Sequence, residues 1–450
     1  MKFNKLKVFA NSNLIAFFIL SVYIFNSSCT SHEESVHVSG PLFENEIIFP
    51  VQDEHVHGSS IVELSNGDLL VCWFQGSGER WADDVRIMGS RRKNGLTEWS
   101  EPFLLADIKE FPDCNPVLFL DGKDRLWLMW ITIIANQWET SLITYRISEN
   151  YLDMAGAPDW NWQDFLILKP GGITERGIQA DDPFVASVEQ QLSDYMEYIK
   201  SDPEKSPYVE RWSDRAERIL SLAKGEDMIR AGHVYNEDGS YEVVPLGYPY
   251  FRRMGWQTRN KPFITESGRM IVPLYSDGFS FSIMAYTDDW GENWKSSTPL
   301  IGSGNIQPAI AQTRSGELVA YMRDNGPPPK RLHVSRSADN GETWSLVQDS
   351  ELHNSGTSCD IVTLENGNWV LINNDTETGR HRLTLSLSED GGKTWPWNRS
   401  VEDDESARFH YPAIIVGEGG VFHITYSYFQ ENNRKSIKYA ITNEEWIRGQ

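Results

Sequence analysis

Apolar and polar positions alternate in short blocks along most of the chain. Six strongly apolar stretches each follow a turn that contains glycine, and they read LLVCWF, LWLMWI, MIVPLY, LVAYM, WVLIN and VFHITYSY. Runs of β-branched and aromatic residues between such turns predict β-strands. The turns recur about every 50 residues apart from one longer interval, with glycines at positions 67, 122, 268, 316, 367 and 419. This period predicts six repeated sheet units.

A second repeat has the same spacing. The pattern Ser/Thr-x-Asp-x-Gly-x-Thr/Asn-Trp occurs at 287–294, 337–344 and 388–395, and a degraded copy runs from Ser90 to Trp99. Asp and Gly suit tight turns, the Ser, Thr and Asp side chains can bond loop N–H groups, and the Trp can pack over the turn. We interpret the motif as a hairpin turn that serves folding rather than as an active site.

Together the two repeats predict an all-β protein, a six-bladed β-propeller that occupies residues 45–450. The chain ends after the expected third strand of the last blade. The segment NEIIFP at 45–50 is predicted to supply the fourth strand, because this pairing would close the ring and cover an open sheet edge. Residues 30–44 are expected to form a linker.

The longer interval lies between the second and third blades and predicts an α-helical insertion at about 155–250. Apolar residues from Phe184 to Ile199 fall at helical spacing, and a second helix is predicted from Glu210 to Lys224. The insertion is either a decoration of the rim or a lid over the propeller mouth, because loops on a rigid scaffold commonly carry function.

Composition narrows the possible partners. The net charge of −23 would repel a polyanion, so nucleic acid is not expected as a partner. Cys72, Cys114 and Cys359 lie in apolar runs without Cys-x-x-Cys spacing, which predicts buried free thiols rather than disulfides. The sequence contains no phosphate-loop, EF-hand or His-Glu-x-x-His motif, and we expect neither a cofactor nor a metal.

The first 29 residues have the pattern of a signal peptide. Three lysines precede an apolar run from Leu14 to Phe25, which is too short to span a bilayer comfortably. Small residues then lead to Cys29, so the segment resembles a bacterial lipoprotein signal in which this cysteine is lipidated. We therefore expect export to the periplasm, outer membrane or cell surface, with a lipid anchor as the only membrane attachment. Ordinary secretion is the alternative.

Blade-start phrases connect the chain to a known family. The phrases are HGSSIVEL at 57–64, NPVLFL at 115–120, NKPFI at 260–264, IQPAI at 306–310 and YPAII at 411–415. With the repeated turn motif, they make nearly all of residues 45–445, apart from the insertion, resemble the sialidase (neuraminidase) superfamily of six-bladed propellers. The resemblance is to bacterial sialidase-like proteins with BNR, or Asp-box, repeats.

The resemblance implies a set of catalytic and binding residues. Sialidases use a tyrosine nucleophile, an aspartate acid/base and arginines that hold the substrate carboxylate. Tyr411 opens the first strand of the last blade, where the family has its tyrosine. Asp84 matches the acid/base, with Asp83 as a rival. Arg323 and Arg380 match two of the arginines, with Arg382 as a rival of Arg380.

Two positions depart from the family pattern. His57 stands where sialidases begin the first blade with arginine, and Gln307 stands where a glutamate normally activates the tyrosine. A glutamine cannot deprotonate a phenol, whereas a histidine titrates near neutral pH and can serve as a base or an acid. A His–Tyr pair beside an arginine-held uronate would also suit β-elimination.

Other polar residues are candidates for the propeller mouth, namely Asn115, Arg259, Lys261, His353 and Asp360. Five tryptophans are candidate sugar-stacking platforms, namely Trp73, Trp81, Trp127, Trp138 and Trp256. The leading prediction is an exported, monomeric, exo-acting glycoside hydrolase for terminal sugars of glycans or polysaccharides, acidic sugars among them. The alternatives are a polysaccharide lyase, a hydrolase of a non-sialic sugar, and a glycan-binding propeller without catalysis.

Overall fold

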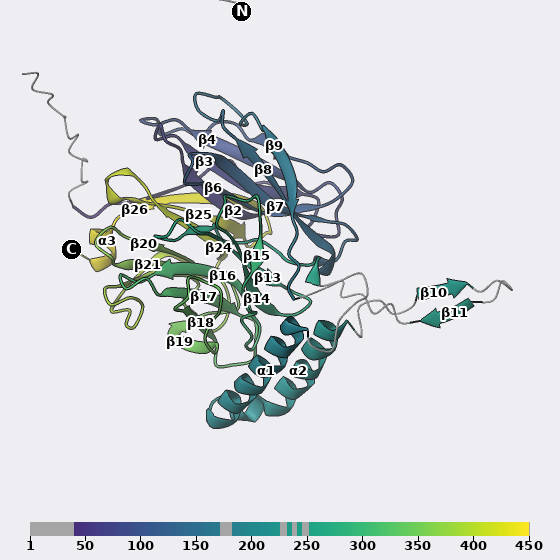
Figure 1. The fold of residues 1–450 in the computed structure, drawn as a ribbon. Coiled ribbons are helices and arrows are strands. Elements are labelled where there is room, and N and C mark those ends of the chain that lie inside the picture. Colours follow the sequence, from purple (N-terminus) through teal and green to yellow (C-terminus); the bar gives the residue numbers. More distant parts are fainter. Residues whose placement is uncertain (1–39, 172–181, 226–231, 236–240, 245–251, 450) are drawn as a thin grey trace, which may run out of the picture. The chain divides into compact units, whose positions relative to one another are not determined.

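The computed structural model describes residues 40–449, except 172–181, 226–231, 236–240 and 245–251 (Figure 1). The predicted signal segment, its Cys29 and most of the predicted linker lie outside the described residues. All described residues belong to one unit, His37–Gln450. In this described part, no helix has the length and apolar character needed to cross a membrane.

In the described ranges, antiparallel strands form six four-stranded sheets that are the blades of a β-propeller (Figure 1). The predicted fold is therefore confirmed. Blade 1 contains β2 (His55–Glu63), β3 (Leu69–Gly76), β4 (Arg86–Arg92) and β5 (Phe103–Ala106). Blade 2 contains β6 (Asp113–Leu120), β7 (Leu126–Ile133), β8 (Ser141–Ser148) and β9 (Trp162–Leu166). Blade 3 contains β12 (Phe263–Ile264), β13 (Met270–Ser276), β14 (Phe281–Thr287) and β15 (Lys295–Ser296).

The remaining blades follow the same order. Blade 4 contains β16 (Asn305–Gln312), β17 (Leu318–Asp324), β18 (Arg331–Ser337) and β19 (Gln348–His353). Blade 5 contains β20 (Asp360–Thr363), β21 (Trp369–Asn373), β22 (Arg382–Ser388) and β23 (Trp397–Asp403). Blade 6 contains β24 (Ala407–Val416), β25 (Phe422–Gln430) and β26 (Lys435–Thr442), with β1 (Phe43–Ile47) as its outer strand. Short helices are η1 (Trp138–Thr140), η2 (Ser206–Tyr208), η4 (Glu418–Gly420) and α3 (Glu444–Arg448).

Closure of the ring occurs in the sixth blade. Strand β1 pairs antiparallel with β26, from Phe43 opposite Thr442 to Ile47 opposite Lys438. The predicted closing strand is confirmed, although it begins at Phe43 and thus within the predicted linker 30–44. This pairing satisfies the open edge of β26, because each strand supplies the backbone donors and acceptors that the other lacks.

The repeated Asp motif forms the turn between the third and fourth strands of blades 3, 4 and 5. In the second copy Asp339 accepts hydrogen bonds from Ser337 Oγ at 2.8 Å and from the N–H of Thr343 at 2.9 Å. The equivalent Asp289 and Asp390 carboxylates accept the same bonds, and hydrogen bonding holds the pKa of each at about 2. The Ser, Thr and Asp side chains of the motif bond within the turn, as expected for a folding device.

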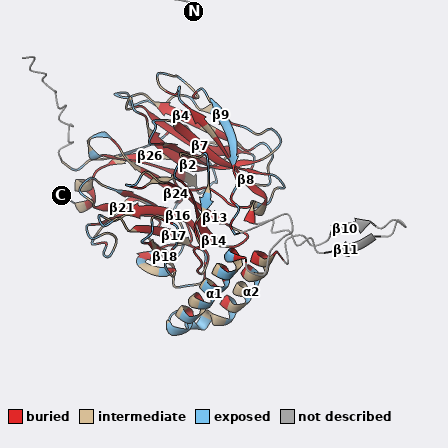
Figure 2. Cartoon of the chain, viewed as in Figure 1, coloured by how far each residue is buried: buried red, intermediate tan, exposed pale blue. Residues whose placement is uncertain are grey.

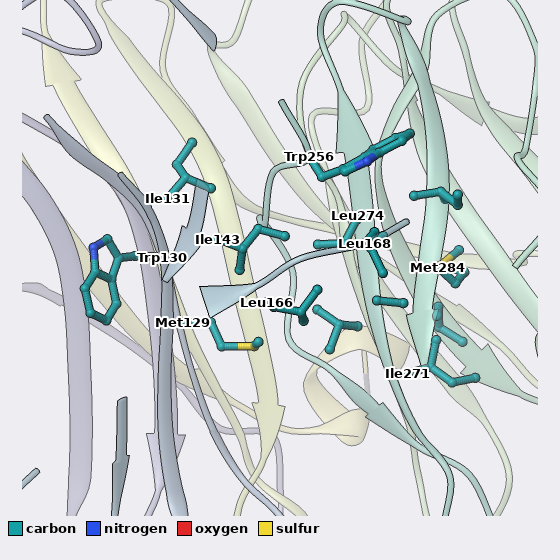
Figure 3. Packing of buried hydrophobic residues seen from close by; sticks show 14 of the residues in the cluster. Met129, Trp130, Ile131, Ile143, Leu166, Leu168, Trp256, Ile271, Leu274 and Met284 are labelled. Carbon is teal, nitrogen blue, oxygen red and sulfur yellow. The ribbon is translucent and has the colours of Figure 1, made fainter. Parts of the chain in front are cut away.

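The blade interiors are apolar on both faces of the middle strands. Figure 2 colours β7 as buried and the outer strand β9 as exposed, and all eight residues of β7 are buried. Apolar residues of blades 2 and 3 form one cluster that includes Met129, Leu166 and Met284 (Figure 3).

Buried tryptophans correct one prediction about sugar platforms. Trp73, Trp127 and Trp256 are at most 2% exposed, so they fill the core and have no free face for a sugar. Of the five candidates, Trp81 is 60% exposed, and Trp138 is half-buried. Cys72, Cys114 and Cys359 are free and buried, as predicted.

The insertion contains two helices, α1 (Pro183–Ser201) and α2 (Val209–Lys224), in the places that the spacing predicts. They follow β9, which lies within the predicted bounds of about 155–250 but belongs to blade 2, so the insertion begins later than predicted. They precede β10 (Gly232–Tyr235) and β11 (Tyr241–Val244). Asp182 caps α1 and forms a buried ion pair with Arg252 at 2.6 Å. Arg252 also donates to the carbonyl of Ala223 in α2 at 2.6 Å, so a single guanidinium group ties both helices together.

Three side chains hold the insertion against blades 3 and 4. Lys205 forms an ion pair with Asp349 of β19 at 2.6 Å. Gln191 accepts a hydrogen bond from the N–H of Ile301 at 3.1 Å, and Arg215 donates to Ser280 Oγ in the β13–β14 hairpin. The insertion is therefore docked beside the loops of these two blades.

Candidate active site

The inner strands of four blades share a β-bulge near their first residues. The pairing register shifts at Gly58-Ser59 in blade 1, Asn115-Pro116 in blade 2, Gln307-Pro308 in blade 4 and Tyr411-Pro412 in blade 6. A bulge adds a residue to one strand and redirects its side chain. The repeated bulge thus places one residue of each blade at an equivalent position near the propeller axis.

The bulge residues adopt an uncommon backbone conformation. The φ angles are 64° at Gly58, 50° at Asn115, 58° at Gln307 and 49° at Tyr411. Left-handed conformations are costly for residues other than glycine and concentrate at functional sites. Gly58 has a packing reason as well, since a Cβ there would lie 2.8 Å from the Phe74 ring. When the bulges of blades 1 and 6 are aligned, His57 corresponds to His410 and Gly58 corresponds to Tyr411.

These bulge residues join a hydrogen-bonded network. Arg323 donates to the Tyr411 hydroxyl at 3.1 Å and to the amide oxygen of Gln307 at 3.3 Å. The amide nitrogen of Gln307 lies 3.4 Å from both the Tyr411 and the Tyr275 hydroxyls. Asn115 donates to Tyr275 at 3.2 Å. Residues separated by almost 300 positions in the sequence therefore meet around two phenols.

Three guanidinium groups surround Tyr411. Arg323 contacts its hydroxyl, and Arg259 lies over its ring at 4.9 Å from the centroid. Arg380 donates to His410 Nδ1 at 2.6 Å, and its charge acts on Tyr411. Among the described residues, none of the three arginines forms an ion pair with a carboxylate. The site therefore has an excess of positive charge in a chain that is strongly acidic overall.

This cationic environment changes the acidity of the tyrosine. Loss of hydration by itself raises the pKa of Tyr411, but Arg323, Arg380 and the hydrogen bond from Gln307 outweigh it and hold the pKa below the ordinary value of 10. Opposite charges nearby favour the ionised form of a phenol. The arginines thus supply part of the activation that a neutral Gln307 cannot.

His57 packs against Tyr411 as an uncharged ring. The two ring centroids lie 4.4 Å apart at 74°, and His57 Nδ1 lies 2.8 Å from Ser427 Oγ. Burial, together with the charges of nearby histidines and arginines, lowers the pKa of His57 well below 6.5. The same causes act on His410, whose Nδ1 must accept because the Arg380 guanidinium can only donate. Both imidazoles are neutral at physiological pH.

The predicted acid/base residues lie in the exposed loop 77–85 between β3 and β4. Asp84 accepts hydrogen bonds from the N–H of Ser77 at 3.1 Å and from its hydroxyl at 2.8 Å. Asp83 accepts from Asn136 at 2.8 Å. Both carboxylates hold the loop in shape, and neither contacts Tyr411 among the described residues.

Glu79 in the same loop has a more suitable position. Its carboxylate lies 3.2 Å from His55 Nε2 and is 24% exposed, and its charge acts on both Tyr411 and Arg380. The sequence contained a signal for it, since Glu79 belongs to the loop in which the acid/base was expected. Family position favours Asp84 and Asp83, whereas the course of the loop brings Glu79 nearer to the charged groups around Tyr411.

A further carboxyl group, Asp277, lies at the end of β13. It accepts a hydrogen bond at 2.9 Å from Gln257, which in turn accepts from Tyr275 at 3.0 Å. Burial raises the pKa of Asp277, although the nearby charge of Arg323 counteracts this. Neither Asp277 nor Tyr275 could be predicted as a site residue from the sequence, because neither occupies a blade-start phrase.

The other candidates have different surroundings. Lys261 pairs with Asp360 at 2.7 Å, and both line a cavity with Ile310 and Val416. Arg382 pairs with Asp403 at 3.1 Å. The side chain of His353 is 46% exposed and lies 3.3 Å from Asp375. In the described part of the chain, no cluster of His, Cys, Asp and Glu is arranged to hold a metal.

The fold and the repeated Asp turns define a sialidase-like propeller. The chain belongs to the family of BNR repeat-like domains, whose model matches residues 67–175 and 255–424. The unmatched interval contains α1 and α2, so the helical insertion is an addition to the family's repeat.

Two known proteins have similar sequences. A sialidase of Bacteroides fragilis strain YCH46 is 26% identical over 159 residues, or 31% of this chain and 29% of that protein. An anhydrosialidase of Macrobdella decora is 33% identical over 192 residues, or 38% of this chain and 25% of that protein. The matches therefore span less than a third of either relative's length.

Solved structures share the fold over a larger part of the chain. A Dyadobacter fermentans protein of unknown function has a TM-score of 0.59 at 12% identity and covers 89% of this chain and 98% of its own. An intramolecular trans-sialidase from Ruminococcus gnavus has a TM-score of 0.55 at 15% identity, with 88% and 96% covered. At these identities the similarity concerns the fold.

Proposed function

We propose that the protein is an exported, exo-acting glycoside hydrolase that releases terminal acidic sugars from glycans or polysaccharides. The observation that carries this proposal is the group of three arginines around Tyr411, none of which has a carboxylate partner among the described residues. Unneutralised guanidinium groups at a site favour an anionic ligand, and their planar forks suit a carboxylate.

The proposed substrate is held by its carboxylate. Arg323 and Arg380 are the binding groups, while Arg259, which is 1% exposed and donates to two backbone carbonyls at 3.2 Å, acts from beneath the Tyr411 ring. The Bacteroides and Macrobdella relatives, a sialidase and an anhydrosialidase, support an acidic sugar. The Ruminococcus trans-sialidase was solved with oseltamivir carboxylate, which is also a carboxylate ligand.

In the proposed reaction Tyr411 is the nucleophile. Tyr411 enters as a phenolate that Arg323 and Arg380 stabilise, and Glu79 enters protonated. The phenolate oxygen bonds to the anomeric carbon as the bond to the leaving oxygen breaks, and Glu79 gives its proton to that oxygen. Water then attacks the anomeric carbon, Glu79 takes a proton from this water, and Tyr411 leaves as a phenolate that Arg323 stabilises. Gln307 orients the phenol through its amide, and the neutral His57 packs beside the ring.

The test is Tyr411→Phe assayed on a panel of terminal glycosides that includes sialosides. We expect turnover to fall below detection while the fold is retained, because only one hydroxyl is removed. Tyr428→Phe in the same blade is the matched control and should keep full activity. Unchanged turnover in the Tyr411 variant would contradict the assignment of Tyr411 as the nucleophile. Binding of glycans without turnover by the unaltered protein would favour a non-catalytic propeller.

Elimination is the second candidate reaction. The neutral imidazole of His57 lies against Tyr411 and can accept a proton, which favours a base that removes the proton α to a uronate carboxylate. The two reactions give different products. Ultraviolet absorbance from an unsaturated uronate would support a lyase, whereas a saturated free sugar would support hydrolysis.

We also propose export with a lipid anchor at Cys29. The support is the sequence pattern of residues 1–29, in which a basic start and an apolar run precede small residues and this cysteine. Metabolic labelling with a palmitate analogue in a bacterial host should label the intact protein. Cys29→Ser should lose the label, and equal labelling of both would contradict the proposal.

A further inference from the structure

A cleft separates the helical insertion from blade 4. It encloses about 430 Å³, part of it open to solvent. Side chains of the insertion line one wall, and the β17–β18 loop and β18 line the other. The residues that matter for its chemistry are Tyr195, Lys205, Arg211, Trp212, Arg215 and His333.

Positive charge predominates in this cleft. Lys205, Arg211 and Arg215 are three cations on its insertion side. Across from them, burial alone would lower the pKa of His333, but Asp324 and Asp349 raise it to about 9, so this imidazole is charged at neutral pH. The cleft thus gathers four cationic side chains in a chain of net charge −23.

The two nearby carboxylates are already engaged. Asp349 lies 2.6 Å from Lys205 and 3.1 Å from His333. Asp324 lies 3.4 Å from His333 and 3.7 Å from Lys330, and it accepts a backbone N–H at 2.7 Å. Because these two acids neutralise two cations, the positive charge of the remaining arginines is uncompensated.

Arg211 and Arg215 lack an acidic partner. Within the described ranges neither forms an ion pair, and the hydrogen bond of Arg215 goes to the neutral hydroxyl of Ser280. Trp212, which is 3% exposed, has an indole N–H without an acceptor among these residues. Guanidinium and indole groups can only donate. Donors therefore outnumber acceptors in the cleft, and the missing partner is an acceptor.

The cleft adjoins the candidate active site. Asp324 lies in its wall and directly follows Arg323, which contacts Tyr411. Burial, together with the charges of Arg323 and Arg211, lowers the pKa of Lys330, so these three cations are close to one another. Positive charge therefore lies both at Tyr411 and along the cleft.

We propose that the cleft between α2 and blade 4 is a second anion-binding site, which takes a carboxylate, sulfate or phosphate group. Arg211 and Arg215 are the charged donors, and the Trp212 N–H is a neutral one. The anionic group can belong to a glycan that also occupies the Tyr411 site or to a free anion, and the acceptor chemistry is the same in both cases.

Binding of inorganic sulfate by isothermal titration calorimetry tests the site, with sodium chloride added to keep the ionic strength constant. We expect saturable binding by the unaltered protein and about tenfold weaker binding by Arg211→Ala, because one charge-assisted hydrogen bond is lost. Arg211 is exposed and forms no hydrogen bond in the described part of the chain, so its replacement should not disturb folding. Arg218→Ala, on the same helix outside the cleft, removes the same charge and should bind like the unaltered protein.

Three outcomes overturn the proposal: no saturable sulfate binding, equal affinities for Arg211→Ala and the unaltered protein, or equal losses in both variants. A chondroitin sulfate tetrasaccharide distinguishes the two sources of the anion. Tighter binding of the tetrasaccharide than of sulfate, lost in Arg211→Ala, assigns the site to glycans, and binding of sulfate alone assigns it to a free anion. Turnover of a small aryl sialoside should be equal in both variants, so this site can fail while the proposed hydrolase activity stands.

Discussion

The Asp turns at the outer side of the blades and the bulges at the inner strands both recur from blade to blade. The turns conserve the residue type at each position, whereas the bulges conserve only the backbone conformation. The turns repeat residues: Asp289, Asp339 and Asp390 accept equivalent bonds in three blades, and each copy makes these bonds within its own turn. The bulges repeat only geometry. Gln307 and Tyr411 share a conformation and not a residue type, and their side chains bond to other blades.

This difference indicates that the Asp turns serve folding and that the bulges serve the chemistry of the site. A repeated residue with local partners stabilises each blade independently, so it reports the fold. A repeated backbone position with a different side chain in each blade brings unlike groups to one place, which is what a reaction requires. Breaking the two kinds of repeat should therefore have opposite consequences.

The largest effect is expected at the inner strands, from Arg323→Met. Loss of this guanidinium removes a donor to Tyr411 and a binding group for the substrate, and kcat/KM should fall about 10³-fold. Arg336→Met, which breaks an ion pair with Glu317 on the same blade, is the control and should leave activity unchanged. Steady-state kinetics on an aryl sialoside provides the measurement, and equal activities would contradict the account.

The loop 77–85 allows a comparison between two carboxylates. Glu79→Gln should lower kcat about 10²-fold and remove one limb of the pH–rate profile, because a positioned acid/base is lost. Asp84→Asn should change kcat only slightly, since Asp84 binds Ser77 in its own loop. A larger loss in the Asp84 variant would return the acid/base role to the residue that family position favoured.

A smaller effect on activity and a clear one on stability are expected at the outer turns. Asp339→Ala removes the bonds from Ser337 and Thr343 and should lower the free energy of unfolding by about 1–2 kcal/mol. Denaturant unfolding measures this change. The kcat/KM of the folded variant should equal that of the unaltered protein. A lower kcat/KM without any loss of stability would contradict the assignment of the outer turns to folding and of the inner strands to catalysis.

The smallest effect concerns pH. The folded-state pKa of His333, about 9, exceeds the ordinary value of 6.5, so its charge stabilises the fold fully below pH 6.5 and less as pH rises through 9. The groups that face it are Asp324, Asp349 and Lys330, with Lys205 and Arg211 from the insertion. The melting temperature should fall by roughly 2 °C more between pH 7 and 10 in the unaltered protein than in His333→Gln. An equal change of melting temperature with pH in the two proteins would contradict this role of His333.

Much of the fold could be predicted because its signals are local. Turn glycines and apolar runs located the blades, and helical spacing located α1 and α2 almost to the residue. The closing strand could be predicted because a blade with three strands leaves an unpaired edge. The start of β1 at Phe43 could not, since it depends on register with β26.

The site could be predicted only where it follows the blade repeat. Tyr411 and Gln307 stand at equivalent blade starts, so their proximity follows from topology. Glu79 and Asp277 lie in irregular loops, whose course depends on contacts with other blades. Lys261 occupies a blade-start phrase as well, but it pairs with Asp360 at the start of β20, two blades further on, which no spacing along the chain reveals.

The most direct test of the central claim is to trap the reaction on Tyr411. Incubation with a fluorinated sialoside that slows release of the sugar should leave a glycosyl group on the protein, and peptide mass spectrometry should locate it on Tyr411. Arg323→Met should label more slowly. A sugar attached to any other residue, or normal turnover with no attachment at all, would contradict the assignment of Tyr411 as the reacting group.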